Sequence, residues 1–186
     1  LHVEDVAISD IASSVGTPFY VYSQSSIEKN YRDFENAMSG TKYLICYAMK
    51  ANSNQAVLKI LGNLGAGMDV VSGGEYLRAK AAGIPSDRIV FSGVGKTRDE
   101  ISLAIKGGIR QFNVESKPEL IEISKVASEL GVEVPITIRI NPDVDAKTHS
   151  KISTGKSENK FGIPIVSARK TYAFAASLKG IRIIGI

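Results

Sequence analysis

Lys50 is the residue whose type and position first suggest chemistry. It lies just beyond the apolar run 43–47, which has the character of a buried strand. A lysine amine forms a Schiff base with an aldehyde cofactor, and partial burial favours its neutral, nucleophilic form. The ordinary alternative is a solvated lysine at the end of a strand, since lysines are common there. Position alone leaves both interpretations open.

Two glycine-containing stretches were candidates for nucleotide-binding turns, and neither fits. Gly65-Ala66-Gly67 has Val70 where the dinucleotide fingerprint needs its third glycine, and it precedes a strand instead of following one. Gly95-Lys96-Thr97 resembles the end of a phosphate-binding loop, but Val90 stands where that loop needs its first glycine. The backbone N–H groups of Gly73-Gly74 would suit an anion, although close packing at the turn is the favoured explanation. The sequence therefore argues against nucleotide binding.

Short apolar runs alternate with amphipathic stretches from residue 43 onward. The runs predicted as strands are 43–47, 68–71, 88–91, 111–114, 134–140 and 181–186, and residues 19–22 form a further, isolated strand candidate. The stretches predicted as helices are 25–38, with Ser25 or Ser26 as its cap, 54–64, 74–82, 98–106, 118–130 and 166–178. Strands buried on both faces and joined by helices pair in parallel.

The fold class that this alternation predicts is α/β. An open doubly wound sheet and a partial (β/α)₈ barrel with about six of its eight parallel strands both fit the pattern. An open dinucleotide-binding sheet concentrates its chemistry on one glycine-rich turn, whereas a barrel distributes it over many strand ends. Because the required turn is missing, we favour the partial barrel.

Several motifs, in order along nearly the whole chain, resemble those of the alanine-racemase-like barrel decarboxylases, the group that holds the diaminopimelate, ornithine and arginine decarboxylases. The lysine motif is Tyr47-Ala48-Met49-Lys50-Ala51-Asn52. The others are Thr17-Pro18-Phe19-Tyr20-Val21-Tyr22, Gly67-Met68-Asp69-Val70-Val71-Ser72-Gly73-Gly74-Glu75 and Arg139-Ile140-Asn141-Pro142. Within the group, His149-Ser150-Lys151-Ile152-Ser153-Thr154-Gly155 followed by Lys160-Phe161-Gly162 is most similar to the diaminopimelate enzymes.

The resemblance implies a site for pyridoxal 5'-phosphate. Lys50 would hold the cofactor aldehyde, and Ala48 would line the edge of the cofactor ring. Asp69 and Arg139 would face the lysine from the ends of the second and fifth strands. The alternative is a structural ion pair in the barrel mouth, and the two interpretations can both hold. His149, in the polar insertion 141–164, would belong to a substrate loop, with an exposed histidine as the alternative.

The resemblance also implies an organisation and an activity. Residues 25–186 would form part of the cofactor-binding barrel, and residues 1–24 would belong to a β-rich domain. The whole protein would be a homodimer that decarboxylates meso-diaminopimelate to L-lysine and CO₂. A cytoplasmic location is the default expectation, because the sequence shows neither a membrane-helix run nor a signal-peptide pattern. The alternatives are an ornithine or arginine decarboxylase, an alanine racemase and a non-catalytic cofactor-binding barrel. We expect the 186-residue chain to be part of a longer protein and to be inactive alone.

Composition excludes other classes of protein. A hydrophobic content of 44% supports one sizeable core, and the formal charge of +4 is too dispersed to indicate a nucleic-acid surface. The single cysteine, Cys46, allows no internal disulfide and is predicted to fill the core. Two histidines are too few to suggest a zinc site, and no apolar run reaches the length of about 20 residues that a membrane helix needs.

Overall fold

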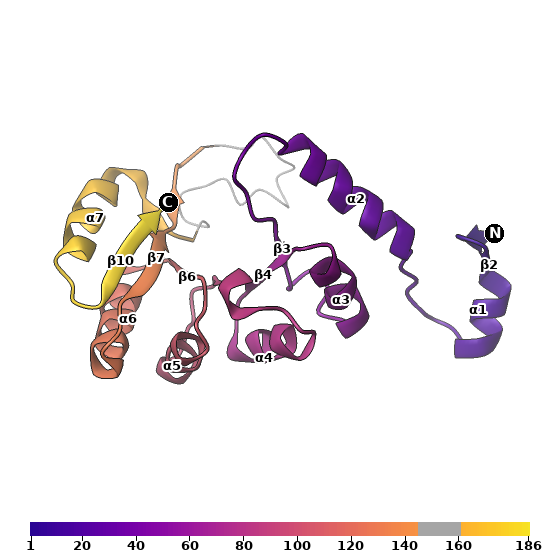
Figure 1. Cartoon of the computed structure of the whole chain (residues 1–186), viewed down its shortest axis with the longest axis horizontal. Helices are drawn as coiled ribbons and strands as arrows, with labels where there is room; N and C mark the ends of the chain where they lie inside the picture. Colours follow the sequence, from indigo (N-terminus) through magenta and orange to yellow (C-terminus); the bar gives the residue numbers. More distant parts are fainter. Residues whose placement is uncertain (145–160) are drawn as a thin grey trace.

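Six parallel strands form one sheet and follow one another across it in sequence order. The computed structural model describes residues 1–144 and 161–186 (Figure 1). The six strands are β3 (Cys46–Ala48), β4 (Gly67–Val70), β5 (Ile89–Phe91), β6 (Gln111–Val114), β7 (Val134–Ile138) and β10 (Ile181–Gly185). A doubly wound sheet reverses its strand order at a switch point, and this sheet has no such reversal. The order confirms the predicted partial barrel and excludes the doubly wound alternative.

One α-helix lies between each strand of this sheet and the next. These helices are α3 (Gln55–Asn63), α4 (Gly73–Ala81), α5 (Arg98–Lys106), α6 (Lys117–Leu130) and α7 (Ala168–Ala176), and they lie along the outer face of the sheet (Figure 1). A capping side chain accepts a hydrogen bond from the first turn of α3, α4, α5 and α6; the caps are Asn54, Ser72, Thr97 and Ser116. Each cap fixes a helix start close to the carboxyl end of the preceding strand.

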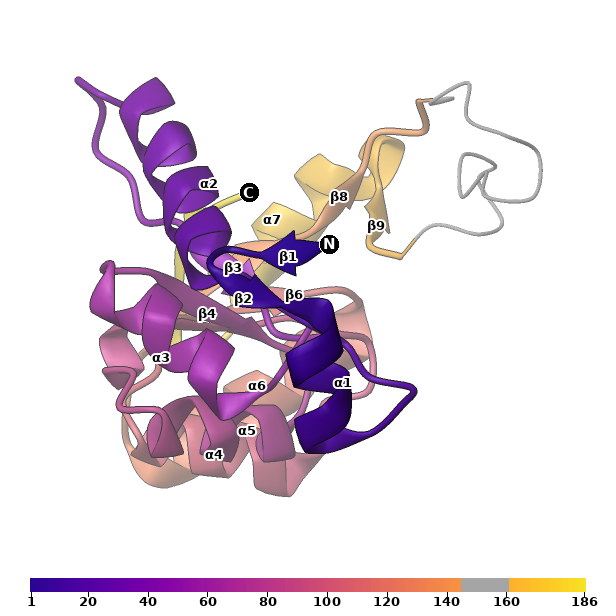
Figure 2. The same cartoon turned by 90° about the vertical axis from the view of Figure 1, so that its right-hand side faces the viewer.

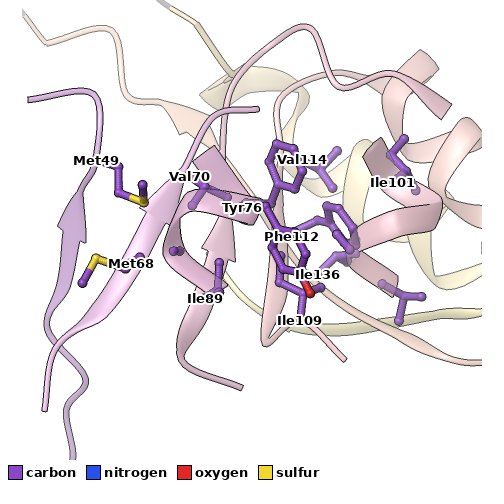
Figure 3. Close-up of a cluster of buried hydrophobic side chains, with 14 of the residues drawn as sticks. Met49, Met68, Val70, Tyr76, Ile89, Ile101, Ile109, Phe112, Val114 and Ile136 are labelled. Carbon is purple, nitrogen blue, oxygen red and sulfur yellow. The ribbon is translucent and has the colours of Figure 1, made fainter. Parts of the chain in front are cut away.

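Alternate residues of the strands pack against these helices and form the core. Met68, Val70, Ile89, Phe91 and Phe112 are among the side chains with no exposed surface. Figure 3 shows this cluster, to which α4 contributes Tyr76 and α5 contributes Ile101. Fully burying a large apolar side chain stabilises the fold by about 1.5 to 3 kcal/mol. Because side chains alternate along a strand, the residues between these positions point to the inner face.

The carboxyl end of β3 sets the position of Lys50. The sequence predicted a strand at 43–47, but pairing with β4 runs only from Cys46, opposite Gly67, to Ala48, opposite Asp69. The strand is therefore shifted toward Lys50. The predicted strand 134–140 likewise ends earlier: β8 (Ile140–Asn141) leaves the main sheet and pairs with β9 (Ile163–Pro164). The predicted helices 54–64, 74–82, 98–106, 118–130 and 166–178 are confirmed within two residues at each end.

The N-terminal part differs most from the prediction. A short hairpin of β1 (His2–Val3) and β2 (Val6–Ala7) precedes α1 (Ile8–Val15), and the sequence predicted none of the three (Figure 2). Residues 19–22 form no strand, and Tyr20 is 90% exposed. A strand needs a partner for its backbone hydrogen bonds, and no described strand lies beside this segment. The prediction of a strand there was wrong for the described residues.

Helix α2 (Gln24–Ala37) begins slightly earlier than predicted. Its cap is Ser23, whose side chain accepts a hydrogen bond from the backbone N–H of Ser26. The predicted caps, Ser25 and Ser26, instead lie in the first turn. These two cap predictions were wrong, because only a residue in extended conformation just before the helix can direct its hydroxyl to the N–H groups of the first turn.

Across residues 1–144 and 161–186, no helix combines the length and apolar character that a membrane crossing requires. The same residues contain no group of three or more histidine, cysteine, aspartate or glutamate side chains that could hold a metal ion.

Candidate functional site

A cavity of about 740 Å³ opens at the carboxyl ends of the parallel strands. Lys50, Asp69 and Arg139, which the sequence singled out, all line it, and Asn113 and Glu115 join them from β6 and the loop after it. This volume is typical of cavities that bind small molecules and cofactors, which span about 300 to 1,000 Å³. The structure therefore brings a lysine, two carboxylates and a guanidinium to one site from four different strand ends.

The other two predicted residues are placed differently. Ala48 lines a neighbouring, mainly apolar cavity of about 480 Å³, to which α2 contributes Tyr31 and Phe34. The structure thus places Ala48 beside the Lys50 cavity and not among the residues that define it. His149 lies outside the described residues.

A backbone contact holds Lys50 beside β4. The backbone N–H of Met49 donates to the carbonyl oxygen of Asp69 at 3.0 Å, and the N–H of Ala51 donates to the carbonyl of Ala48 at 3.1 Å. The Met49 side chain is completely buried, whereas Lys50 is exposed to the cavity. The chain therefore turns sharply here and presents the lysine amine to the cavity from a fixed position.

The Asp69 carboxylate has a neutral partner just after the next strand, β5. Its Oδ1 accepts a hydrogen bond of 2.5 Å from the hydroxyl of Ser92, and Ser92 Oγ accepts one of 2.8 Å from the amide of Asn113. Sequence reasoning singled out neither Ser92 nor Asn113. A period-two alternation of polar and apolar residues in 111–114 was the available signal, because alternate residues of a barrel strand point inward.

Arg139 pairs with Glu115 and not with Asp69. Its Nη1 lies 2.9 Å from both carboxylate oxygens of Glu115, and the backbone N–H of Gly93 donates to Oε1 at 2.9 Å. An ion pair between Asp69 and Arg139, the structural alternative from the sequence, was wrong. β4 and β7 are separated by two strands, whereas Glu115 follows β6, the neighbour of β7. The sequence did not single out Glu115, because the pairing depends on strand order.

A buried charge pair joins the loop after β5 to α6. The Lys96 side chain has no exposed surface, and its Nζ lies 2.7 Å from Oε1 of Glu119, whose side chain is 6% exposed. Nζ also donates to the carbonyl oxygens of Gly93 and Asn113, at 2.7 and 3.0 Å. Lys96, considered in the sequence only as part of a phosphate-binding loop, is thus a buried cation with three acceptors.

The start of α4 is occupied by a carboxylate of the chain itself. The backbone N–H of Gly73 donates to Oε1 of Glu100 at 2.7 Å, and a Cβ at Gly73 would lie 3.0 Å from Cγ of Glu100. This contact agrees with the close packing that the sequence favoured at Gly73-Gly74.

Cys46 is expected to react slowly with alkylating reagents. Burial, with a further contribution from the Asp69 carboxylate, raises the pKa of its thiol to about 11. At pH 8 the reactive thiolate fraction falls from roughly one in ten, for a usual pKa near 9, to roughly one in a thousand. We expect iodoacetamide to modify Cys46 about 100-fold more slowly than it modifies the denatured protein, as followed by mass spectrometry of the Cys46 peptide. Asp69→Asn should accelerate the reaction, and equal rates in folded and denatured protein would contradict the prediction.

Comparison with known proteins places this site in context. Residues 24–186 match the family described as "Pyridoxal-dependent decarboxylase, pyridoxal binding domain". The chain is 53% identical to a diaminopimelate decarboxylase of Pseudomonas aeruginosa over 100% of its own length and 45% of that protein. It is 47% identical to the enzyme of that name from Aquifex aeolicus, again over all of its length and 44% of the relative.

Solved structures agree with the fold. The diaminopimelate decarboxylase of Helicobacter pylori, complexed with L-lysine, superposes with a TM-score of 0.90 and 44% identity over 96% of this chain and 45% of that one. The enzyme of that name from M. jannaschii, also in complex with L-lysine, gives a TM-score of 0.89 and 41% identity over 99% of this chain and 44% of that one. The chain thus spans less than half the length of the relatives that it matches.

Proposed function

Because the chain belongs to the pyridoxal-dependent decarboxylases, we propose that the full product of its gene converts meso-diaminopimelate to L-lysine and CO₂. The observation that carries the proposal is the 53% identity, over the whole chain, to a protein named diaminopimelate decarboxylase. Two similar structures that contain L-lysine support the same product. The proposal concerns the full gene product, since the chain covers about 45% of these relatives.

The site fits the aldehyde-bearing end of pyridoxal 5'-phosphate. The cavity of about 740 Å³ has the size of an ordinary cofactor site, and it contains an exposed lysine amine that can condense with an aldehyde. The residues with which the chain would hold the cofactor are Lys50, Asp69 and Arg139, with Ala48 near the edge of the ring. When bound, pyridoxal phosphate supplies an electron sink for the electrons that a leaving carboxylate releases.

The chain's own residues hold and orient the reactants. Lys50 Nζ would hold the aldehyde carbon of the cofactor, and its free amine could carry a proton beside the reacting carbon. The buried Met49 side chain excludes water from the core side of this turn. The guanidinium of Arg139, fixed by Glu115, presents donors in a constant orientation, and Asp69 supplies a negative charge beside Lys50. His149, as a residue of a substrate loop, stays a prediction.

We also infer the organisation that the resemblance implied. Residues 25–186 would contribute part of the barrel, and residues 1–24 would join a β-rich domain of the full gene product. The exposure of Tyr20 and Tyr22, 90% and 60%, supports this inference, because large exposed aromatic side chains are suited to cover by another domain. The full gene product would act as a homodimer in the cytoplasm.

The proposed activity is tested by substrate comparison. We expect the full gene product, loaded with pyridoxal phosphate, to release CO₂ and L-lysine from meso-diaminopimelate with a kcat/KM roughly 100-fold or more above that for L-ornithine or L-arginine. Hydrogen-bonding groups that match the distal end of the substrate would be left unpaired by the wrong amino acid. A preference for ornithine or arginine would contradict the substrate assignment. Racemisation of alanine, or cofactor binding without turnover, would instead favour the racemase or the non-catalytic protein.

A further inference from the structure

A chain of hydrogen bonds crosses the inner face of four consecutive strands and ends at Asp69. The Ser92 hydroxyl lies 2.5 Å from Asp69 Oδ1, and Asn113 Nδ2 lies 2.8 Å from Ser92 Oγ. On the far side, Asn113 Oδ1 lies 2.7 Å from the Thr137 hydroxyl and 2.9 Å from Gln111 Nε2. All five residues line the cavity that contains Lys50, and we call them the Asp69 chain.

The direction of these bonds follows from the number of protons available. A carboxylate only accepts, so the single hydroxyl proton of Ser92 is used on Asp69. Ser92 Oγ must then accept, which requires the NH₂ group of Asn113 to face it. The Asn113 oxygen therefore faces the opposite way, where Thr137 and Gln111 both donate to it. A flipped Asn113 amide would place the Gln111 donor against an NH₂ group. It would also make Asp69 and the Asn113 oxygen compete for the single hydroxyl proton of Ser92.

Every donor in the Asp69 chain thus points toward Asp69. Hydrogen bonds in series polarise one another, and the effect is largest where the series ends at a charge inside a partly buried site. The same residue also holds the lysine turn, because its carbonyl oxygen accepts from the backbone N–H of Met49 at 3.0 Å. Asp69 is therefore fixed through both its backbone and its side chain, next to the residue that would bind the cofactor.

We propose that Ser92 and Asn113 are positioning residues for the cofactor site: they orient the Asp69 carboxylate beside Lys50 through a one-directional chain of hydrogen bonds. This inference rests on the proposed function, because the carboxylate matters as the charge that faces the bound cofactor. It also goes beyond that function, since neither Ser92 nor Asn113 carries a role there. Thr137 and Gln111 contribute to the Asp69 chain as well, since their hydrogen bonds fix which way the Asn113 amide faces.

Two substitutions test the chain in the full gene product. Ser92→Ala removes the proton that Asp69 receives, and Asn113→Asp adds a second carboxylate that competes for it. We expect each variant to raise the dissociation constant for pyridoxal phosphate roughly tenfold, the scale of a lost hydrogen bond to a charged group, and to displace the pH profile of the bound cofactor's visible absorbance. The double variant should be little worse than either single one, because one break already interrupts the series. Ser92→Thr retains the hydroxyl and should restore both readouts.

Ser124→Ala is the matched control. The Ser124 hydroxyl, also in a largely buried position, donates to the carbonyl of Lys179 at 2.7 Å, on α6 and away from the cavity. This variant should lose comparable thermal stability and leave cofactor affinity and absorbance unchanged. If Ser92→Ala does not fold, the comparison of Asn113→Asp with Ser92→Thr tests the inference. Both variants retain polar groups, but only Ser92→Thr keeps the direction of donation toward Asp69.

The outcomes separate this inference from the proposed function. If the unmodified protein binds pyridoxal phosphate and decarboxylates substrate, while Ser92→Ala and Asn113→Asp keep its affinity and absorbance profile, the Asp69 chain is only structural and the inference is wrong. If the unmodified protein takes up no pyridoxal phosphate, the proposed function fails and the inference fails with it.

Discussion

Replacing Lys50 by alanine is expected to abolish decarboxylation by the full gene product, with kcat falling by a factor of roughly 10³ or more. The lysine amine would serve twice, first as the attachment point for the cofactor aldehyde and then as a proton carrier beside the reacting carbon. No other amine is presented to the cavity from the described part of the chain. Because Lys50 is exposed, its removal should leave thermal stability unchanged, so the loss of activity reports chemistry and not folding.

The attachment itself can be measured without turnover. Borohydride reduction of the full gene product with bound pyridoxal phosphate should leave a stable adduct on the peptide that contains Lys50, and the Lys50→Ala protein should carry none. Lys42→Ala and Lys59→Ala are matched controls, since one lies before β3 and the other on α3. Both should keep full activity and labelling. A label on Lys42 or Lys59 would show that the assignment of Lys50 is wrong.

The order of the parallel strands could be predicted from sequence because short strand-like runs alternate regularly with helices. β5 is apolar and buried throughout, β6 alternates polar and apolar residues, and a helix lies in each gap, so parallel neighbours in sequence order are the simplest arrangement. Exact strand ends were less accessible. β3 is set by its pairing with β4, and this pairing begins at Cys46 although the apolar run starts earlier.

The N-terminal segment shows where local patterns are insufficient. Residues 19–22 have the aromatic and β-branched composition of a strand, but composition cannot supply the neighbouring strand that its backbone groups need. The hairpin of β1 and β2 has only two residues on each side, too few for a periodic signal. In both cases the outcome depends on partners that the local sequence does not encode.

The candidate site was predictable where a residue follows a strand end, and not where its role depends on a partner. Lys50 was placed at a strand end from the pattern of strands, Asp69 and Arg139 were placed at the same rim by the family resemblance, and all three line one cavity in the structure. The partner of Arg139 was not predicted, because Glu115 belongs to a different strand end. Lys96 and Glu119, separated by 23 positions, form their pair only after two strand-helix units have packed together.

That buried pair carries the largest stability effect we expect. Lys96→Met should destabilise the protein by about 3 to 5 kcal/mol, because it leaves the Glu119 carboxylate buried without its counter-charge. The substitution also removes the donor to the carbonyls of Gly93 and Asn113. Chemical denaturation of the full gene product measures the loss. Lys29→Met is the control, since the ion pair of Lys29 with Asp33 is exposed and should contribute nothing measurable.

A double variant distinguishes the effect of the uncompensated Glu119 charge on stability from the effect of lost packing. Glu119→Gln removes the negative charge but keeps an acceptor for the backbone N–H of Glu115, which lies 3.1 Å from Glu119 Oε2. Lys96→Met with Glu119→Gln should therefore be more stable than Lys96→Met alone, although each single change is destabilising. Strict additivity of the two losses would show that the pair does not interact.

The cost of Lys96→Met should also depend on pH. Burial raises the pKa of the Glu119 carboxyl above its usual 4.5, the charge of Glu115 acts in the same direction, and Lys96 opposes both. Without Lys96 the pKa of Glu119 rises further, so above pH 4.5 the folded state holds a proton that the unfolded state has lost. Stability then falls as pH rises through the folded-state pKa, and the deficit of Lys96→Met should be smaller at pH 5 than at pH 8. A deficit that is constant across this range would mean that the carboxylate reaches another cation or water when Lys96 is removed.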